Sequence, residues 1–342
     1  MILLTKKGRI LSGHRPTGRL HIGHYEGTLR TWAALQDDYD CFFEIADWHA
    51  LTTGYADIES MPRRVEEIAI DWLASGLDPE RSTLFVQSDV PEHAELFLLL
   101  GMVTPVSWLE RCPTYKDQIA NLSDGAGPGF GLLGYPVLQA ADIVIYKANV
   151  VPVGEDQLPH LELTREIVRR FNNFYGEVFP EPEAMLSEFA LVPGVDGRKM
   201  SKSYDNAINL ADAPDEVRAK MKSMFTDPEK IRMGDPGHPD VCPVYVYHRM
   251  YQEDPPRLEQ IKVSCEAGDR GCVDCKVEAT DRLLDKVGPV MQRREELAEN
   301  LDYVHEVLRH GAEKAASVAC ETIDEVRAAM HLETTGWRGG SA

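Results

Sequence analysis

Residues 12–24 read SGHRPTGRLHIGH and connect a strand-type segment, residues 9–13, to a helix-type pattern that begins at Ile22. A helix N-terminus carries unpaired N–H groups and the positive end of the helix dipole, so it suits a phosphate. His21 and His24 are three residues apart and share one face of the first turn. The segment predicts a phosphate site in which two imidazoles donate hydrogen bonds to a phosphoryl oxygen. Two surface histidines at a helix start are the alternative.

Strand-type and helix-type segments alternate on both sides of this stretch, which predicts an α/β fold with a doubly wound, Rossmann-like parallel sheet. The further strands are expected at residues 41–46, 83–86 and 150–153, and the helices at 22–33, 65–73, from about 91, and 161–174. Beyond residue 210 only helical patterns remain, at 216–225, 278–299 and 303–330.

These patterns divide the chain into a Rossmann-like catalytic domain over residues 1–210 and an all-α domain over residues 211–333. A connecting insertion with a mobile glycine-rich loop is expected at about 104–133, and a disordered tail at 334–342.

The composition is that of an ordinary globular protein, with 342 residues, 43% hydrophobic and 27% charged. No segment approaches the roughly 18 apolar residues of a membrane span, and the N-terminus lacks the order of a signal peptide. We therefore expect a cytoplasmic protein with no membrane partner. The net charge of −20 argues against extensive, sequence-blind binding to nucleic acid, and DNA is not expected as a partner.

A second segment, residues 194–203, reads GVDGRKMSKS and places Lys199 and Lys202 in a glycine-flanked loop. Lysine meets phosphate as a point charge, and a flexible loop can bring such charges onto a leaving pyrophosphate only as the transition state forms. Taken alone, a basic loop is usually solvated surface.

Together, HIGH at residues 21–24 and KMSKS at 199–203 resemble the paired signatures of class I aminoacyl-tRNA synthetases. A given five-letter string arises by chance in such a chain with odds of about one in ten thousand. The resemblance implies activation of an amino acid by ATP with Mg²⁺, followed by transfer to tRNA with release of AMP and pyrophosphate. It implies catalytic roles for His21, His24, Lys199 and Lys202, and Lys116 is a weaker candidate for the same phosphates.

Within this class the chain looks like the related tryptophan and tyrosine enzymes, through VGEDQ at residues 153–157 and YPVLQAAD at 135–142. The ATP-binding residues that the resemblance implies are Arg15, Thr17, Gly23, His24, Gly154, Asp156, Gln157, Lys199, Met200, Ser201 and Lys202. Arg15 departs from the glutamine that many bacterial relatives carry, which leaves its contact open.

The pocket residues favour tryptophan over tyrosine. An indole N–H only donates, so one acceptor suffices, and Asp142 supplies it. Tyrosine enzymes add a tyrosine hydroxyl for the phenol, and here that position is the apolar Leu11. ADWHAL at residues 46–51 also looks like the tryptophan enzymes. The expected tryptophan-binding residues are Leu11, His49, Tyr135, Gln139 and Asp142.

Four of the seven cysteines form a candidate thiolate site, with 22, 6 and 2 residues between successive members: Cys242, Cys265, Cys272 and Cys275. Four thiolates suit either tetrahedral zinc or an iron–sulfur cluster, and the residues alone do not separate the two. One group of tryptophan enzymes has this spacing and carries a 4Fe-4S cluster, so the resemblance implies that cluster in a structural role. Cys41, Cys112 and Cys320 lie in apolar patterns and are expected in the core.

The resemblance finally implies a homodimer that binds tRNA across its two subunits. Three other readings stay open: a tyrosine enzyme, a small-molecule nucleotidyltransferase that shares the His-x-Gly-His fold, and a catalytically silent paralogue with a binding or regulatory role.

Overall fold

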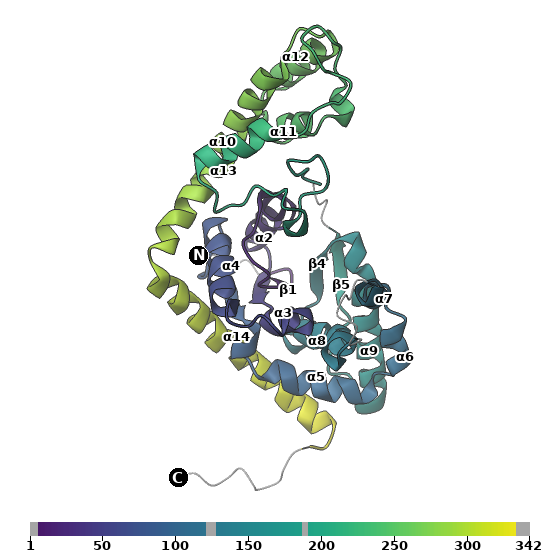
Figure 1. Ribbon diagram of the computed structural model, residues 1–342. Coiled ribbons are helices and arrows are strands. Elements are labelled where there is room, and N and C mark those ends of the chain that lie inside the picture. The colour runs from purple at the N-terminus through teal and green to yellow at the C-terminus, as the bar shows by residue number, and fades with distance from the viewer. Residues whose placement is uncertain (1–5, 121–127, 187–190, 333–342) are drawn as a thin grey trace.

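The computed structural model describes residues 6–120, 128–186 and 191–332. Its centre is a five-stranded sheet of parallel strands in the order β3-β2-β1-β4-β5 (Figure 1). The strands are β1 (Arg9–His14), β2 (Asp40–Ile45), β3 (Ser82–Val86), β4 (Val150–Val153) and β5 (Glu183–Leu186). The predicted α/β fold with a parallel sheet is confirmed. Strand β5 was not predicted, because this short edge strand is partly exposed and lacks a buried apolar run.

Helices cover both faces of the sheet, so neighbouring residues of one strand enter different cores. Ile10 and Phe43 belong to one apolar cluster, whereas Leu11 and Phe42 belong to the other. Two-sided burial is what a doubly wound sheet requires. The helices up to β5 are α1 (Ile22–His24), α2 (Arg30–Leu35), α3 (Asp47–Gly54), α4 (Met61–Ala74), α5 (Glu92–Val103), α6 (Val106–Glu110), α7 (Pro113–Ala120), α8 (Phe130–Ile145) and α9 (Leu158–Tyr175), with a π-helical turn at Tyr25–Leu29.

Beyond residue 210 the described part of the chain contains helices and no strand, as expected. Its helices are α10 (Pro214–Ser223), α11 (Pro243–Tyr251), α12 (Pro255–Glu266), α13 (Cys272–Ala298) and α14 (Leu301–Ala329). Figure 1 shows α11 and α12 at the far end of α13, away from the sheet, and α14 returning along the body. Helix α13 begins six residues before the predicted start at 278. None of the described helices is long and apolar enough to cross a membrane.

Helix α14 packs most closely on the edge strand β3. Gly311 makes this approach possible, because a Cβ at that position would lie 1.7 Å from the carbonyl oxygen of Leu84. The last helix therefore completes the core around the sheet. The division of the chain at residue 211 stays a prediction, as do the mobile loop and the tail, whose residues 121–127 and 334–342 lie outside the described ranges.

A buried ion pair also joins the two halves. Arg294 on α13 donates to Asp71 on α4 through Nε, with 2.6 Å between Nε and Oδ1. The other oxygen of Asp71 accepts the backbone N–H of Leu20, at 2.8 Å. Leu20 directly precedes His21, so the helical half is connected through Asp71 to the first sequence motif.

The close approach at Gly311 generates a stability prediction. Gly311→Ala should lower the free energy of unfolding by about 3 kcal/mol, because the added methyl group must displace the backbone of β3. Gly288→Ala on α13 is the matched control, since nothing lies within 4 Å of its added Cβ. There alanine should be neutral or stabilising. Chemical denaturation measures both, and equal stabilities for the two variants would contradict this packing.

Candidate active site

The two sequence motifs lie against each other. The backbone N–H of Ile22 donates to the carbonyl of Ile208, at 3.0 Å, and that of Leu210 donates to the carbonyl of Leu20, also at 3.0 Å. The segment that follows the lysine loop is thus paired with the segment that carries the histidines. Residues 184 positions apart become neighbours, as Lys202 shows by donating through Nζ to the carbonyl oxygen of Gly18, at 2.8 Å.

His21 and His24 form a compact pair at the start of α1. Their ring centroids are 3.8 Å apart, and Nδ1 of His24 accepts the backbone N–H of His21 at 3.2 Å. Gly23 is required here, because a Cβ would lie 2.9 Å from the His21 ring. Burial, reinforced by the charge of Lys202, lowers the pKa of His21 to about 4 and the pKa of His24 well below its usual value. Both rings are therefore neutral at pH 7, and each can donate one N–H without carrying charge.

The lysine loop is held by Asn206, which is 1% exposed. Its Oδ1 accepts the backbone N–H of Ser201 at 2.8 Å, and its Nδ2 donates to the carbonyl of Lys199 at 3.2 Å. Lys199 itself is exposed, whereas burial lowers the pKa of Lys202 to about 8. Asn206 was not predicted as a site residue, because an isolated buried amide follows no periodic pattern in the sequence.

A cavity of about 380 Å³ opens beyond the carboxyl ends of β1, β2 and β4, where ligands bind in parallel sheets. The residues predicted to bind tryptophan all line it, together with three of the predicted ATP-binding residues: Leu11, His49, Tyr135, Gln139, Asp142, Arg15, Gly154 and Gln157. The structure thus brings residues from β1, α3 and α8 together as the predictions require.

A larger cavity of about 1370 Å³ adjoins the first, and both are lined by Thr28 and Gly154. Besides Gly154 and the histidine His21, the predicted ATP-binding residues that line it are Thr17, Gly23, His24, Asp156, Lys199, Met200, Ser201 and Lys202. Lys116 on α7 is exposed and lines neither cavity. Two adjoining cavities, one carrying lysines and the other a buried carboxylate, suit a phosphate-bearing ligand beside a smaller one.

The carboxylate of Asp142 is the centre of a buried polar cluster in the smaller cavity. Its Oδ2 contacts His49 Nε2 at 2.8 Å, and its Oδ1 contacts Gln87 Nε2 at 2.8 Å and His93 Nδ1 at 2.6 Å. Burial raises the pKa of Asp142, but the hydrogen bonds from His49 and His93 outweigh it, and the pKa is lowered overall. Asp142 is therefore ionised. Gln87 and His93 follow β3 in the chain and were not predicted, since nothing local marks them.

A second hydrogen-bonded chain links α8 to residues 154–157. The hydroxyl of Tyr135 contacts His160 Nε2 at 2.8 Å, and His160 Nδ1 contacts Gln157 Oε1 at 3.0 Å. Burial raises the pKa of Tyr135, so its hydroxyl keeps its proton and can donate to His160. One side of the smaller cavity is thus coupled to the entrance of the larger one.

The four spaced cysteines gather at the far end of the helical half. Cys242 precedes α11, Cys265 lies on α12, and Cys272 and Cys275 occupy the first turn of α13. All four line a cavity of about 20 Å³. Gly237 permits the approach of this segment, because a Cβ there would lie 2.5 Å from the sulfur of Cys265.

Of the other three cysteines, all of which were predicted to lie in the core, two are buried and one is exposed. Cys41 and Cys112 are buried, as expected. The prediction for Cys320 is wrong: it lies on α14, is exposed, and donates its S–H to Glu92 at the start of α5.

Comparison with known proteins places this geometry in a family. The family profile described as "tRNA synthetases class I (W and Y)" matches residues 4–285. The chain belongs to this family. It is 49% identical to a tryptophan–tRNA ligase from Thermotoga maritima, with 95% of this chain and 99% of the relative covered. It is 45% identical to the enzyme of the same name from Aquifex aeolicus, over 95% of this chain and 100% of the relative.

A solved structure shows the same fold. The tryptophanyl-tRNA synthetase from Campylobacter jejuni, complexed with ADP and tryptophan, superposes with a TM-score of 0.86 at 33% identity. The match covers 94% of this chain and 99% of that one. The likeness extends beyond the catalytic fold, because it includes the helical half as well.

Proposed function

We infer that the chain is a tryptophan–tRNA ligase, which activates L-tryptophan with ATP and transfers it to tRNA, releasing AMP and pyrophosphate. The observation that carries this conclusion is 45–49% identity to tryptophan–tRNA ligases across 95% of the chain. Identity over the whole length argues against a nucleotidyltransferase that shares only the catalytic fold. The intact motifs argue against a silent paralogue.

The smaller cavity supports tryptophan as the amino acid. Leu11 is 3% exposed and contributes an apolar surface suited to an indole ring. The Asp142 cluster supplies the negative pole toward which an indole N–H points, and His49, Tyr135 and Gln139 complete the site. A tyrosine hydroxyl would find no hydroxyl partner at position 11, which leaves the phenol half-satisfied and disfavours tyrosine.

The larger cavity supports the activation step. The tryptophan carboxylate forms a bond to the α-phosphorus of ATP. The bond between that phosphorus and the oxygen that bridges to the β-phosphorus breaks, and pyrophosphate leaves with the electron pair. The neutral His21 and His24 donate N–H groups toward the α-phosphoryl oxygens. Lys199 and Lys202 meet the charge that develops on the leaving pyrophosphate, together with the Mg²⁺ that ATP carries. The enzyme thus contributes mainly positioning and charge stabilisation.

Lys202→Met should lower the rate of tryptophan-dependent ATP–pyrophosphate exchange by a factor of 100 or more, because the loop loses a cation that acts in the transition state. Tryptophan affinity should change little, since Lys202 lines only the larger cavity. Isotope exchange measures the rate, run separately with tryptophan and with tyrosine.

Lys222→Met is the control for this experiment, because Lys222 is exposed on α10 and lines neither cavity. It should exchange at the wild-type rate. Exchange by the wild type with tyrosine would refute the substrate assignment. Unchanged exchange by Lys202→Met would refute the role of the loop.

We further propose that Cys242, Cys265, Cys272 and Cys275 hold a 4Fe-4S cluster with a structural role. Tetrahedral zinc, with Zn–S bonds of about 2.3 Å, would place its sulfur ligands roughly 3.8 Å apart. Within the described residues, no three of the four sulfur atoms lie within 4.8 Å of one another. This spacing is wider than that of a closed tetrahedral zinc site, and the choice of a 4Fe-4S cluster rests on the resemblance of the cysteine spacing in sequence. The four cysteines lie at the far end of the helical half, away from both cavities. This position supports a role in stabilising the fold of that region.

Anaerobically purified protein should contain iron and inorganic sulfide in equal amounts, about four of each per chain. Cys272→Ser should remove most of both and of the visible absorbance, whereas Cys320→Ser should retain them, because Cys320 lies on α14 away from the cavity. One zinc per chain without sulfide would overturn the iron–sulfur assignment.

A homodimer is supported by an exposed apolar surface on α5 and α6. Leu98 and Met102 on α5 and Val106 on α6 are 55%, 67% and 56% exposed. Such a group of large apolar side chains marks an interaction site more often than free surface. We propose that a second copy covers it, that the dimer binds tRNA, and that the enzyme acts in the cytoplasm.

Met102→Glu should shift the protein from dimer to monomer in sedimentation experiments, because it introduces a charge at the centre of this surface. Ile231→Glu is the control, since Ile231 is 82% exposed but lies in the helical half. It should leave the dimer intact. A monomeric wild type would contradict the proposal directly.

A further inference from the structure

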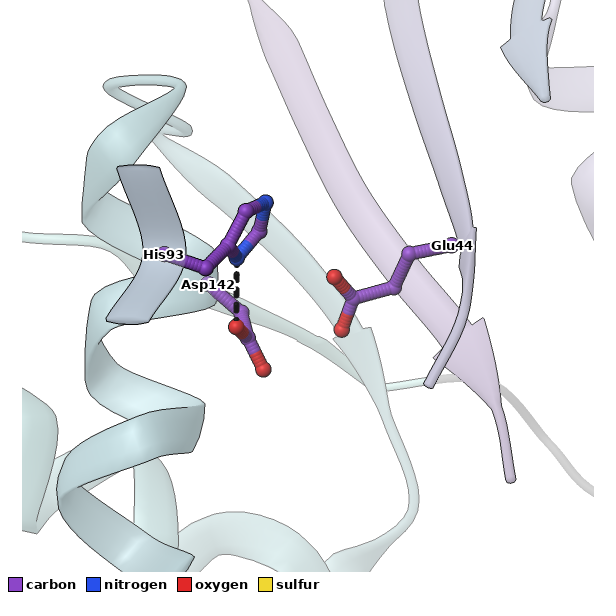
Figure 2. A group of neighbouring side chains, drawn as sticks. All are labelled: Glu44, His93 and Asp142. Atoms are coloured by element: carbon purple, nitrogen blue, oxygen red, sulfur yellow. Dashed lines mark hydrogen bonds and ion pairs between the residues drawn. The ribbon is translucent and has the colours of Figure 1, made fainter. Parts of the chain in front are cut away.

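Glu44, at the end of β2, is a buried acid that the roles described so far do not use. It is 5% exposed and lines the smaller cavity. Figure 2 shows its carboxyl group directed toward that of Asp142, which His93 contacts through the hydrogen bond drawn as a dashed line. One ligand atom from each of the three side chains lies within 4.8 Å of the other two. Oε2 of Glu44 is buried and receives no hydrogen bond from any residue that the structure describes.

The two neighbouring acids have opposite surroundings. Asp142 receives hydrogen bonds from three nitrogen donors, on Gln87, His93 and His49. Glu44 receives none at Oε2, and burial raises its pKa well above the usual value, helped by the negative charges of Asp142 and Asp47. Two carboxylates at this distance cannot both be ionised in a buried site. Asp142 therefore holds the charge and Glu44 holds the proton.

Protonated Glu44 can donate one more hydrogen bond, and the carboxylate of Asp142 can still accept one. A carboxylate offers about four lone-pair positions, and three are taken by the nitrogen donors. The protonated carboxyl group of Glu44 is placed to bring in its O–H as a further donor, because its ligand atom lies within 4.8 Å of that of Asp142. Such a bond to a charged acceptor is short and strong.

A metal ion is a poorer explanation for the same three residues. Both ring nitrogens of His93 are engaged, Nδ1 with Asp142 and Nε2 with the hydroxyl of Tyr146, each at 2.6 Å. Neither nitrogen has a lone pair directed at the space between the carboxyl groups. His93 is therefore already committed to hydrogen bonds through both of its ring nitrogens.

We propose that Glu44 is a positioning residue for tryptophan recognition, whose carboxyl O–H holds the Asp142 carboxylate toward the cavity. The proposal rests on the inferred tryptophan specificity. When base removes the proton from Glu44, the hydrogen bond is replaced by repulsion between two anions. Asp142 then loses its orientation, and tryptophan affinity falls. The titratable groups that face this pair are His49 and Asp47 from α3, His93 from α5, and Tyr146 beyond α8.

The test is the dissociation constant of tryptophan, measured without ATP by equilibrium dialysis between pH 6.5 and 9.5, for the wild type, Glu44→Gln and Glu44→Leu. Glutamine can donate through its amide at any pH, so this variant should bind within about threefold of the wild type at pH 7. Leucine cannot donate, and it should weaken binding at least tenfold. The wild type should lose affinity at alkaline pH more steeply than Glu44→Gln.

Comparison with Glu44→Gln separates Glu44 from the amino group of tryptophan, which titrates in the same range for every variant. Identical pH profiles for the wild type and Glu44→Gln would overturn the proposal, as would unchanged affinity in a folded Glu44→Leu. Should Glu44→Leu fail to fold, the wild type and Glu44→Gln still decide. Absence of tryptophan binding by the wild type would instead mean failure of the inferred function.

Discussion

The buried carboxylate of Asp71 connects the helical half of the chain to the segment that carries the active-site histidines. A charge without partners is costly to bury, so Asp71 must be satisfied on both of its oxygens. One oxygen accepts the backbone of Leu20, and the other accepts Arg294 from the helical half. The histidines at 21 and 24 follow directly in the chain. Their position therefore depends on a helix that begins some 250 residues later.

The electrostatics of the two cavities are complementary. At neutral pH the larger cavity contains uncharged histidines beside lysines, whereas the smaller one contains an ionised Asp142. Burial removes the charge from His21. Asp142 stays charged in spite of burial, because three nitrogen donors surround its carboxylate. The overall charge of −20 therefore does not predict the charge inside either cavity, because the few groups buried in each cavity determine its local charge.

Local patterns predicted most of the sheet, and the family resemblance carried by the motifs implied the residues proposed to bind ATP and tryptophan directly. Strands β1 to β4 are apolar runs beside clear turns, and the motifs at 21–24 and 199–203 are continuous in sequence. What could not be predicted depends on contacts between distant segments. Asn206, Gln87 and Glu44 have roles only because of what packs against them, and a single sequence contains no signal for those neighbours. The exposed Cys320 shows the same limit, because its apolar surroundings in sequence lie on the other side of α14.

Helix α14 has a consequence for synthesis on the ribosome. It covers β3, at the edge of a sheet whose first strands are made hundreds of residues earlier. Until residue 329 has left the exit tunnel, the apolar side chains that face α14 lack their cover, including Phe85. The nascent chain thus carries an uncovered edge strand for most of its translation. Such exposed edges favour aggregation, so the emerging chain depends on rapid completion or on chaperones that shield β3 in the meantime.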